Sequence, residues 1–600
     1  MSADRTPSLL EPLLSGKARL AQATATALWI ACLGYFWLWW LRPEHFTDWL
    51  PYTLVTVCLA WLTLNHAFYL VVTFNPLRPS PSIAPPSDLR VAMVVTKAPS
   101  EPFSIVRTTL EAMLAQQLPH DTWLADEAPT PETIAWAEAH GVRISTRFGV
   151  ADYHRATWPR RTRCKEGNLA YFYDFYGYEL YDVVVQLDAD HVPEPGYLEA
   201  MVRPFADPTV GYVSAPSICD LNAGSSWSAR GRLYAEASLH GTLQAGYNGG
   251  WATLCIGSHY AVRTKALKAI GGLGPELAED HSTTLLMNAG GWRGVHAIDA
   301  IAHGLGPETF SALAVQEFQW SRSLVTLLLQ YTGQYLGRLS PLQKFQFLYS
   351  QLWYPLSSLT MLLGVLMPIL ALAFDFTFVN VSYFEFLNHV IPMGIVVTAI
   401  AFLQRSSGTC RPYDAKILSW ESAVFACARW PWVVLGTIAA ITDTVARRHT
   451  EFRVTPKGSG AANDLPYPLV LPYAVISLVS GLVAYAIHDV QMANGYYLLA
   501  SLNAVLYAVV FAVIVLAHRR ENRVARRGVG WAARMSTAAV LSVFPVLVTS
   551  QHGLEIIDAM TWRSNVKLIE TRFSVAGAGM GPSVRRQFSF SIKWPGADEL

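Results

Sequence analysis

Long apolar segments on both sides of a more polar region constrain the fold of this chain more than any other sequence feature. Two of them, near 25–41 and 52–73, come early, and each approaches the roughly 20 residues that a helix needs to cross a bilayer core. Hydrophobic residues make up 52% of the chain and charged residues only 15%, a composition that is unusual for a purely water-soluble protein. The sequence therefore predicts a multi-pass membrane protein with a retained N-terminal anchor.

Four more spans are predicted after residue 340, at 346–374, 388–404, 466–488 and 494–517. The apolar segment 417–444 is followed by the basic sequence ARRHTEFRVTPK, which a crossing here would place outside the cell. Because Lys and Arg favour the cytoplasmic side of a membrane, 417–444 is predicted to be an amphipathic helix on the inner membrane surface. The remaining apolar stretch, 536–549, is short for a span and is predicted to be soluble structure.

Six crossings place both termini, and the region between the second and third spans, in the cytoplasm. That region, 85–305, alternates strand-like runs such as VAMVV and DVVVQLD with helix-like runs such as PETIAWAEAHG. This alternation predicts an α/β domain with a mainly parallel sheet. Ligands of such sheets bind beyond the carboxyl ends of the strands.

Two carboxylates and an imidazole directly follow one of these strands in the sequence VVVQLDADHVP, namely Asp188, Asp190 and His191. Carboxylates one residue apart can both reach one divalent cation, and their hard oxygen atoms suit Mg²⁺ or Mn²⁺, which often also bind substrate phosphates. A solvated Asp-x-Asp turn is the alternative interpretation, because turns favour Asp. The context of the pair decides between the two.

The rest of the composition excludes several classes of protein. Seven cysteines without a CxxC pair support neither a disulfide framework nor a zinc site. A formal net charge of +1 gives no sign of nucleic-acid binding.

A series of motifs in a fixed order supplies the missing context. They are LADEAP, CKEGNLAYF, QLDADHVPEPGYL, CIGSHYAVRTKAL, GPELAEDHSTTL, QEFQWSRSL and EFRVTPKG. Together with the membrane layout, and from about residue 90 to 520, they closely resemble the processive family 2 glycosyltransferases, specifically the bacterial cellulose synthase-like branch. The resemblance implies an α/β catalytic domain of the GT-A type inserted between transmembrane α-helices, with Mg²⁺ or Mn²⁺ as cofactor.

The resemblance also implies roles for residues of the catalytic domain. Asp126 takes the place of the aspartate that contacts the uracil end of the nucleotide, and Lys165 would face the diphosphate. The strand-end residues Asp188, Asp190 and His191 would hold the donor and the metal. Asp280, with Glu279 beside it, matches the Thr-Glu-Asp motif, whose aspartate is the catalytic base.

Two further elements are assigned by the same resemblance. Gln316 and Trp320 match the QxxRW motif, which holds the leaving group and the growing chain. The gating loop FxVTxK, which closes over bound nucleotide, is matched by Phe452, Val454, Thr455 and Lys457.

The chain departs from the family at Gln319, which stands where the family has Arg. A positive contact to the diphosphate or the acceptor is then missing from this position. Arg322 or a Lys elsewhere in the chain is a candidate substitute.

The implied activity is processive, inverting transfer that polymerises a β-glucan from UDP-glucose and exports it across the bacterial inner membrane. Polymerisation of another UDP-sugar such as UDP-N-acetylglucosamine, and non-processive transfer to a lipid carrier, are the alternative enzyme activities. A transporter or scaffold that only binds nucleotide sugar is the alternative from another class. The expected partners are the UDP-sugar, the growing polysaccharide, the lipid bilayer and periplasmic export proteins, and no nucleic acid.

The basic start of the tail has two interpretations. Arg523-x-x-x-Arg527 fits the short element that precedes the cyclic-di-GMP-binding domain of cellulose synthases, and a positive-inside cluster after the last span is the alternative.

The predicted division of the chain is a cytoplasmic segment 1–24, two transmembrane helices in 25–73, the catalytic domain 85–305, interfacial helices with the QxxxW element 306–345, two transmembrane helices in 346–404, an interfacial helix and gating loop 417–465, two transmembrane helices in 466–517 and a cytoplasmic tail 518–600.

Overall fold

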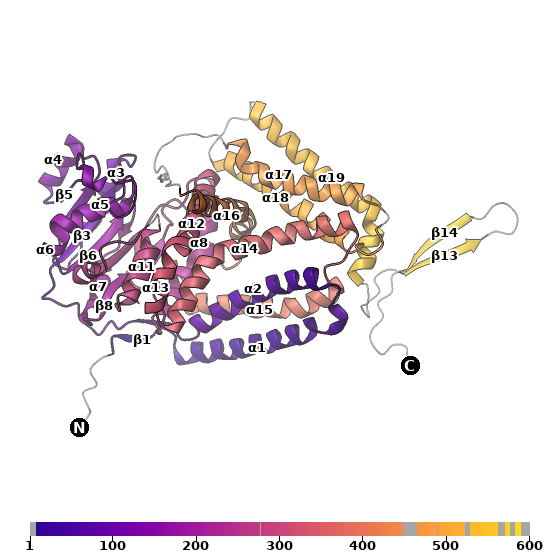
Figure 1. Cartoon of the computed structure of the whole chain (residues 1–600), viewed down its shortest axis with the longest axis horizontal. Coiled ribbons are helices and arrows are strands. Elements are labelled where there is room, and N and C mark those ends of the chain that lie inside the picture. Colours follow the sequence, from indigo (N-terminus) through magenta and orange to yellow (C-terminus); the bar gives the residue numbers. More distant parts are fainter. Residues whose placement is uncertain are drawn as a thin grey trace, which may run out of the picture.

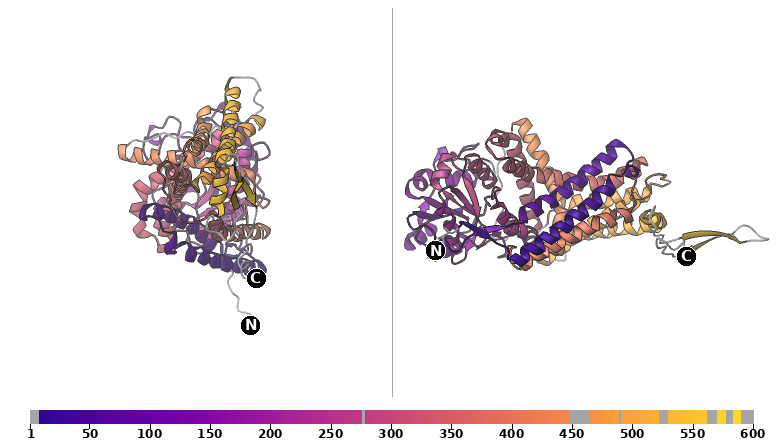
Figure 2. Two further views of the ribbon diagram at one scale, coloured as in Figure 1. Left: turned by 90° about the vertical axis from the view of Figure 1, so that its right-hand side faces the viewer. Right: turned by 90° about the horizontal axis from the view of Figure 1, so that it is seen from below.

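The computed structural model of the chain describes residues 8–275, 278–447, 465–488, 490–521, 529–561, 570–576 and 583–589. An α/β domain lies at one end of the molecule, and long helices extend from it in the other direction (Figure 1, Figure 2). The first long helix, α1 (Gly16–Trp40), packs against α15 (Tyr383–Ser406), although the whole α/β domain lies between them in sequence. The helices before and after the α/β domain therefore form one helical body.

A seven-stranded sheet with the order β11-β8-β10-β6-β3-β4-β5 forms the centre of the α/β domain. Its strands are β3 (Val91–Lys97), β4 (Asp121–Asp126), β5 (Arg143–Ser145), β6 (Val183–Asp188), β8 (Val210–Ser214), β10 (His259–Arg263) and β11 (Arg293–His296). Only β10 runs antiparallel to its neighbours, so the expectation of a mainly parallel sheet in an α/β fold is confirmed. A small second sheet has the order β7-β12-β9. Its strands are β7 (Val192–Pro193), β12 (Ala302–His303) and β9 (Ser217–Ile218), which follow β6, β11 and β8 in sequence.

The two faces of the large sheet contribute side chains to two separate apolar cores, because successive side chains of a strand point to opposite faces. Met93 of β3 packs on one face with helices α3 (Phe103–Leu114) and α7 (Tyr197–Val202). Val94 packs on the other face with α5 (Lys165–Phe172), α10 (Thr264–Ala269) and α11 (Glu279–Ala289). Burial on both faces explains why the central strands read as continuous apolar runs.

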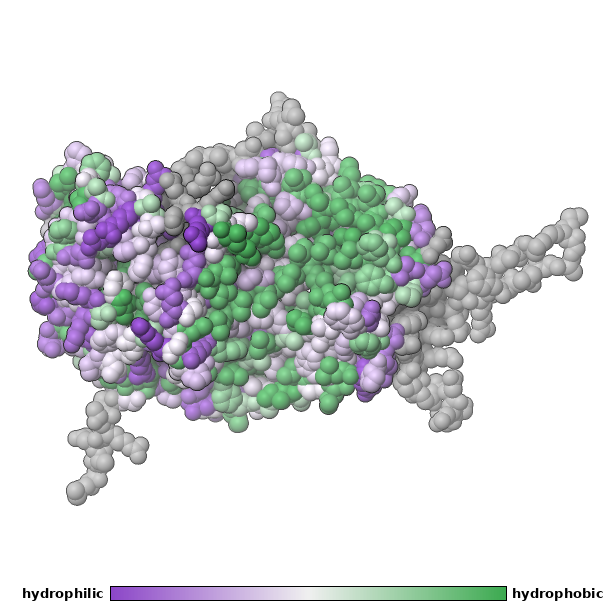
Figure 3. Space-filling view, viewed as in Figure 1, coloured by the Kyte–Doolittle hydropathy of each residue, from purple (hydrophilic) through white to green (hydrophobic). Residues whose placement is uncertain are grey.

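Eight helices in the described part of the chain are long and apolar enough to cross a membrane. They are α1, α2 (Trp49–Thr73), α14 (Pro341–Phe374), α15, α16 (Trp420–Ala446), α17 (Tyr467–Ala486), α18 (Tyr496–Glu521) and a 21-residue part of α19 (Val529–Thr561), Ala533–Gly553. Apolar side chains cover the surface of this helical body, whereas the surface of the α/β domain is mostly polar (Figure 3). Length and composition thus add two helices, α16 and α19, to the six predicted spans.

Helix α16 lies across the long helices instead of beside them (Figure 1, Figure 2). It packs closely on the helices that follow the α/β domain: a Cβ atom on Gly436 would come within 2.4 Å of the Phe318 carbonyl oxygen of α12 (Phe310–Leu327). A Cβ atom on Gly231 of α8 (Trp227–Ser238) would likewise lie 2.9 Å from the Glu421 carbonyl oxygen at the start of α16. The placement of this segment along the membrane surface stays a prediction, since α16 is also long and apolar enough to cross.

The apolar stretch 536–549 is part of a longer element than its sequence indicates. It lies within the 33-residue helix α19, so the premise that it is too short for a span was wrong. The run is bounded in sequence by polar residues, yet the helix continues because it packs on α17 and α18. At Gly481 of α17, a Cβ atom would lie only 2.8 Å from the Phe544 side chain.

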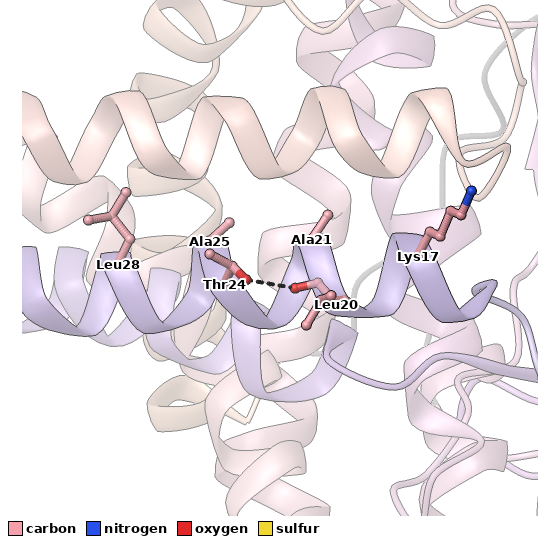
Figure 4. A pocket seen from close by; sticks show the side chains of 6 residues that line it. All are labelled: Lys17, Leu20, Ala21, Thr24, Ala25 and Leu28. Carbon is pink, nitrogen blue, oxygen red and sulfur yellow. Dashed lines mark hydrogen bonds between the residues drawn. The ribbon is translucent and has the colours of Figure 1, made fainter.

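A shallow hollow lies along α1 and is lined by Lys17, Leu20, Ala21, Thr24, Ala25 and Leu28 (Figure 4). The Thr24 hydroxyl donates to the Leu20 carbonyl oxygen at 3.0 Å, which leaves an almost wholly apolar lining. None of the residues with predicted chemical roles contributes to it. The hollow is a surface feature of a candidate membrane helix.

Replacing Leu187, the fully buried last apolar residue of β6, with Ala tests how much the strand core contributes to stability. The cavity left in the core is expected to lower the free energy of unfolding by about 2–5 kcal/mol. Thermal unfolding of the detergent-solubilised protein measures the effect. Leu221→Ala, at an exposed loop position, is the matched control and should change stability by less than about 0.5 kcal/mol; equal effects of the two variants would contradict the assignment.

Candidate active site

Three neighbouring parallel strands end in polar side chains at the same edge of the large sheet. Lys97 ends β3, Asp126 ends β4 and Asp188 ends β6, and the register pairs Lys97 with Asp126 and Thr96 with Asp188. The fully buried Asp126 carboxylate contacts the Lys97 ammonium at 3.2 Å and accepts a hydrogen bond from the Ala128 amide. Sequence reasoning missed Lys97, whose only signal was its position at the end of a predicted strand.

Asp188, Asp190 and His191 come together as the prediction of a metal site requires. One possible ligand atom from each lies within 4.8 Å of the others, in the only such group among the described residues. The carboxylate of Asp190 accepts from the Leu305 amide at 2.9 Å and lies 3.5 Å from His191 Nδ1. Gly304 makes room for this imidazole, since a Cβ atom there would lie 2.3 Å from it.

The donor set of this cluster fits the predicted cofactor. Carboxylate oxygens are the ligands that Mg²⁺ and Mn²⁺ prefer, and an imidazole nitrogen is also a common ligand of transition metals. Burial opposes protonation of His191, but the nearby Asp190 carboxylate and Cys219 outweigh it and raise its pKa to about 9. A metal ion bound here would therefore displace a proton from the imidazole, since only the neutral ring is a ligand.

Lys165 connects the strand ends to a second acidic group. Its ammonium donates to Asp188 Oδ1 at 2.8 Å and to the Gly257 carbonyl oxygen at 2.6 Å. Burial disfavours the charged form, but the negative charges of Asp188, Glu279 and Asp280 outweigh it and raise the pKa of Lys165. Lys165 is thus a fixed cation between two groups of carboxylates.

Glu279 and Asp280 form the second acidic group, at the first turn of α11. The Asp280 carboxylate accepts from the His281 amide at 2.7 Å, and a Cβ atom on Gly257 would lie 3.0 Å from Asp280 Oδ2. Burial raises the pKa of both carboxyl groups, and the charge of Asp280 raises that of Glu279 further. Carboxylates with raised pKa values are suited to taking a proton near neutral pH.

Gln316 and Trp320 lie on one face of α12, as their spacing of four residues requires. This helix reaches the acidic group, because the Ser323 hydroxyl accepts from the Ala278 amide at 2.9 Å. Arg232 of α8 contacts both predicted residues: its Nη1 donates to Gln316 Oε1 at 3.2 Å, and its guanidinium carbon lies 4.3 Å from the centre of the Trp320 ring. Sequence reasoning missed Arg232, which no motif includes.

Arg322, the candidate substitute for the missing arginine, points elsewhere. Its Nε donates to Asp443 Oδ2 of α16 at 2.9 Å, and its guanidinium lies over the Phe318 ring. It therefore ties α12 to α16, and the cation beside Trp320 is Arg232.

A buried arginine supports the loop that precedes Lys165. Arg147 is fully buried, forms an ion pair with Glu127 and donates to the carbonyl oxygens of Tyr153, Arg161 and Cys164. Gly167 is required for this packing, since a Cβ atom there would lie 2.2 Å from Arg147 Nη1.

Two groups of predicted residues lie outside the described part of the chain. They are the gating-loop residues Phe452, Val454, Thr455 and Lys457, and the tail residues Arg523 and Arg527.

Comparison with known proteins agrees with the arrangement of the site. Residues 183–402 match the model of the family described as Glycosyl transferase family group 2. Cellulose synthase 2 of Novacetimonas hansenii is 24% identical over 527 residues, which cover 84% of this chain and 30% of that protein. The UDP-forming cellulose synthase 1 catalytic subunit of Komagataeibacter xylinus is 27% identical over 290 residues, which cover 46% of this chain and 36% of the relative.

The chain thus spans about a third of the length of these curated relatives. The matches confirm the predicted resemblance: residues 183–402 match a family 2 glycosyltransferase model, and the chain is similar in sequence to cellulose synthases.

Solved structures give weaker matches. A mannosyltransferase from Pyrobaculum calidifontis aligns with a TM-score of 0.36 and 15% identity, covering 70% of this chain and 99% of that one. Glucosyl-3-phosphoglycerate synthase from Mycobacterium tuberculosis aligns with a TM-score of 0.28 and 17% identity, covering 41% and 81%.

Replacing Asp190 with Asn tests the metal cluster without reference to catalysis. Loss of one carboxylate charge is expected to weaken Mn²⁺ binding by about tenfold or more. Calorimetry or the electron paramagnetic resonance signal of free Mn²⁺ measures the affinity. Glu111→Gln, on the exposed face of α3, should leave it unchanged; unchanged affinity in Asp190→Asn would refute the site.

Proposed function

We propose that this protein is a processive, inverting β-glycosyltransferase that polymerises a β-glucan from UDP-glucose and moves the product across the inner membrane. The observation that carries the proposal is the contact of Lys165 with Asp188, which sets the predicted donor and metal residues beside the acidic pair. A single charged side chain thereby connects the group that would hold the nucleotide to the group that would activate the acceptor.

Glycosyl transfer from a sugar nucleotide places negative charge on the departing diphosphate. The ammonium of Lys165 is positioned by Asp188 and the Gly257 carbonyl group, and it offsets that charge without moving. A divalent ion held by Asp188, Asp190 and His191 would act there as a Lewis acid toward the same leaving group.

The acceptor hydroxyl is a weak nucleophile and must lose its proton as it attacks. Asp280 is the base in this proposal, since the His281 amide orients its carboxylate and burial makes it more basic than an exposed aspartate. Attack opposite the leaving group inverts the anomeric centre, so an α-linked nucleotide sugar gives a β-linked product. Trp320 would offer a flat apolar face to the acceptor sugar.

The membrane part of the proposal rests on the candidate spans that flank the catalytic domain on both sides. Helix α12 carries Trp320 and packs on both α16 and α14, so the proposed acceptor site adjoins the helical body. We place the α/β domain and both ends of the chain in the cytoplasm, which requires that α19 does not cross the membrane if α16 lies along its surface. Export partners and control by cyclic-di-GMP remain predictions from the resemblance.

Incubation of the purified protein with radiolabelled UDP-glucose and Mg²⁺ tests the proposed reaction. The expected product is a polymer that β-glucanases digest to labelled oligosaccharides. Parallel reactions with UDP-N-acetylglucosamine identify the alternative polymer. UDP-glucose hydrolysis alone, or a lipid-linked monosaccharide, would contradict processive synthesis.

Asp280→Asn is expected to lower polymer synthesis by about 10²–10⁴-fold, because the amide cannot take a proton. The affinity for UDP should change little, and its measurement serves as the control for folding of the site. Synthesis at the normal rate would remove Asp280 from the role of base.

The raised pKa of Asp280 predicts the acid side of the activity profile. The base is active when ionised, so activity should fall as the pH drops through a pKa above the ordinary value of about 4. Lys165 lowers the pKa of Asp280, and Lys165→Met should therefore shift this limb of the profile to higher pH. Initial rates of sugar transfer at different pH values measure the limb; a shift to lower pH would contradict the assigned electrostatics.

A further inference from the structure

Arg232 lies at the junction of the catalytic domain and the helical body, and no sequence motif assigns it a role. It is on α8, and its side chain is only 13% exposed. Its guanidinium covers one face of the half-buried Trp320 ring at 4.3 Å. A buried arginine stacked on an aromatic ring fixes the plane of the ring more strongly than a lysine would.

The orientation of Arg232 is fixed by its hydrogen bonds. Nε donates to Glu236 Oε2 at 3.0 Å, one turn along α8, and Nη1 donates to Gln316 Oε1 at 3.2 Å. Nη2 makes no hydrogen bond to the residues that the structure describes, and remains available to a hydroxyl or an anion. Arg232 thus contacts both predicted acceptor-site residues, Gln316 and Trp320, and its Nη2 is a further hydrogen-bond donor.

The surroundings keep this side chain charged. Burial opposes the charged form of Arg232, but the negative charge of Glu236, which its Nε contacts at 3.0 Å, outweighs burial and raises the pKa of the guanidinium.

We infer that Arg232 is the positioning residue of the acceptor site: it fixes Trp320 and Gln316 from α8 and supplies the positive charge that Gln319 does not. The inference rests on the proposed function. The face of Trp320 opposite the guanidinium is then held in one orientation toward a sugar ring.

Moving the positive charge from position 232 to position 319 tests the inference. Residues 316, 319 and 320 share one face of α12, so an arginine at 319 would lie beside the same two side chains. Arg232→Gln is expected to raise the KM for cello-oligosaccharide acceptors about tenfold, with the donor KM changed less than about twofold. Adding Gln319→Arg to Arg232→Gln should recover most of the acceptor affinity, which a merely structural role of Arg232 would not allow.

Two further variants complete the experiment. Arg322→Gln removes another arginine, one on α12 that binds Asp443, and should leave the acceptor KM near that of the wild type. Arg232→Lys keeps the charge but loses the planar stack, and it replaces Arg232→Gln if that variant does not fold. A smaller rise in acceptor KM is expected for it.

An unchanged acceptor KM in the Arg232 variants, an equal rise in Arg322→Gln, or no recovery by Gln319→Arg would overturn the inference. Calorimetry of cello- and chito-oligosaccharide binding in the absence of donor tests the role of Arg232 without requiring polymer synthesis. Wild-type protein that binds oligosaccharide but makes no polymer contradicts polymer synthesis, and loss of binding in Arg232→Gln would still support the inference. Polymer synthesis with equal oligosaccharide binding in both proteins would contradict the inference alone.

Discussion

The contact between Lys165 and Asp188 is the interaction on which the rest of the site depends. Asp188 ends a strand, Lys165 begins a helix, and Asp280 begins another, so three separate elements meet at one ammonium. The strands themselves are held by cores on both faces of the sheet, which leaves the strand ends little freedom. Electrostatic stabilisation of a leaving group requires this kind of preorganised charge.

The buried charges around this contact stay in place because each has partners. Arg147 is fully buried, yet it forms an ion pair with Glu127 and donates to three carbonyl groups. Glu317 of α12 is paired with Arg429 of α16 at 2.6 Å, which connects the helix that carries Trp320 to the crosswise helix. Removing one member of such a pair leaves the other buried and uncompensated, at a cost of about 3–5 kcal/mol. The site and the helical body are therefore coupled through paired charges as well as through apolar packing.

The sequence was sufficient for the features that local patterns encode. The Val-rich run ending in Asp188 is a buried strand, and the three residues predicted as metal ligands at its end lie close together. Contacts between distant segments were out of reach: Arg232 and Gln316 are 84 positions apart, and no periodicity links them. The length of α19 was also missed, because polar residues end its apolar run while tertiary packing continues the helix.

A structure of the protein with UDP and Mn²⁺ bound, determined by electron cryomicroscopy, tests the account most directly. The account predicts the ion on Asp188 and Asp190, the diphosphate against Lys165, and the uracil toward the Asp126 end of the sheet. The face of Trp320 opposite Arg232 should point to the same space as the Asp280 carboxylate. An ion bound elsewhere, or a nucleotide that does not touch the carboxyl ends of β4 and β6, would contradict it.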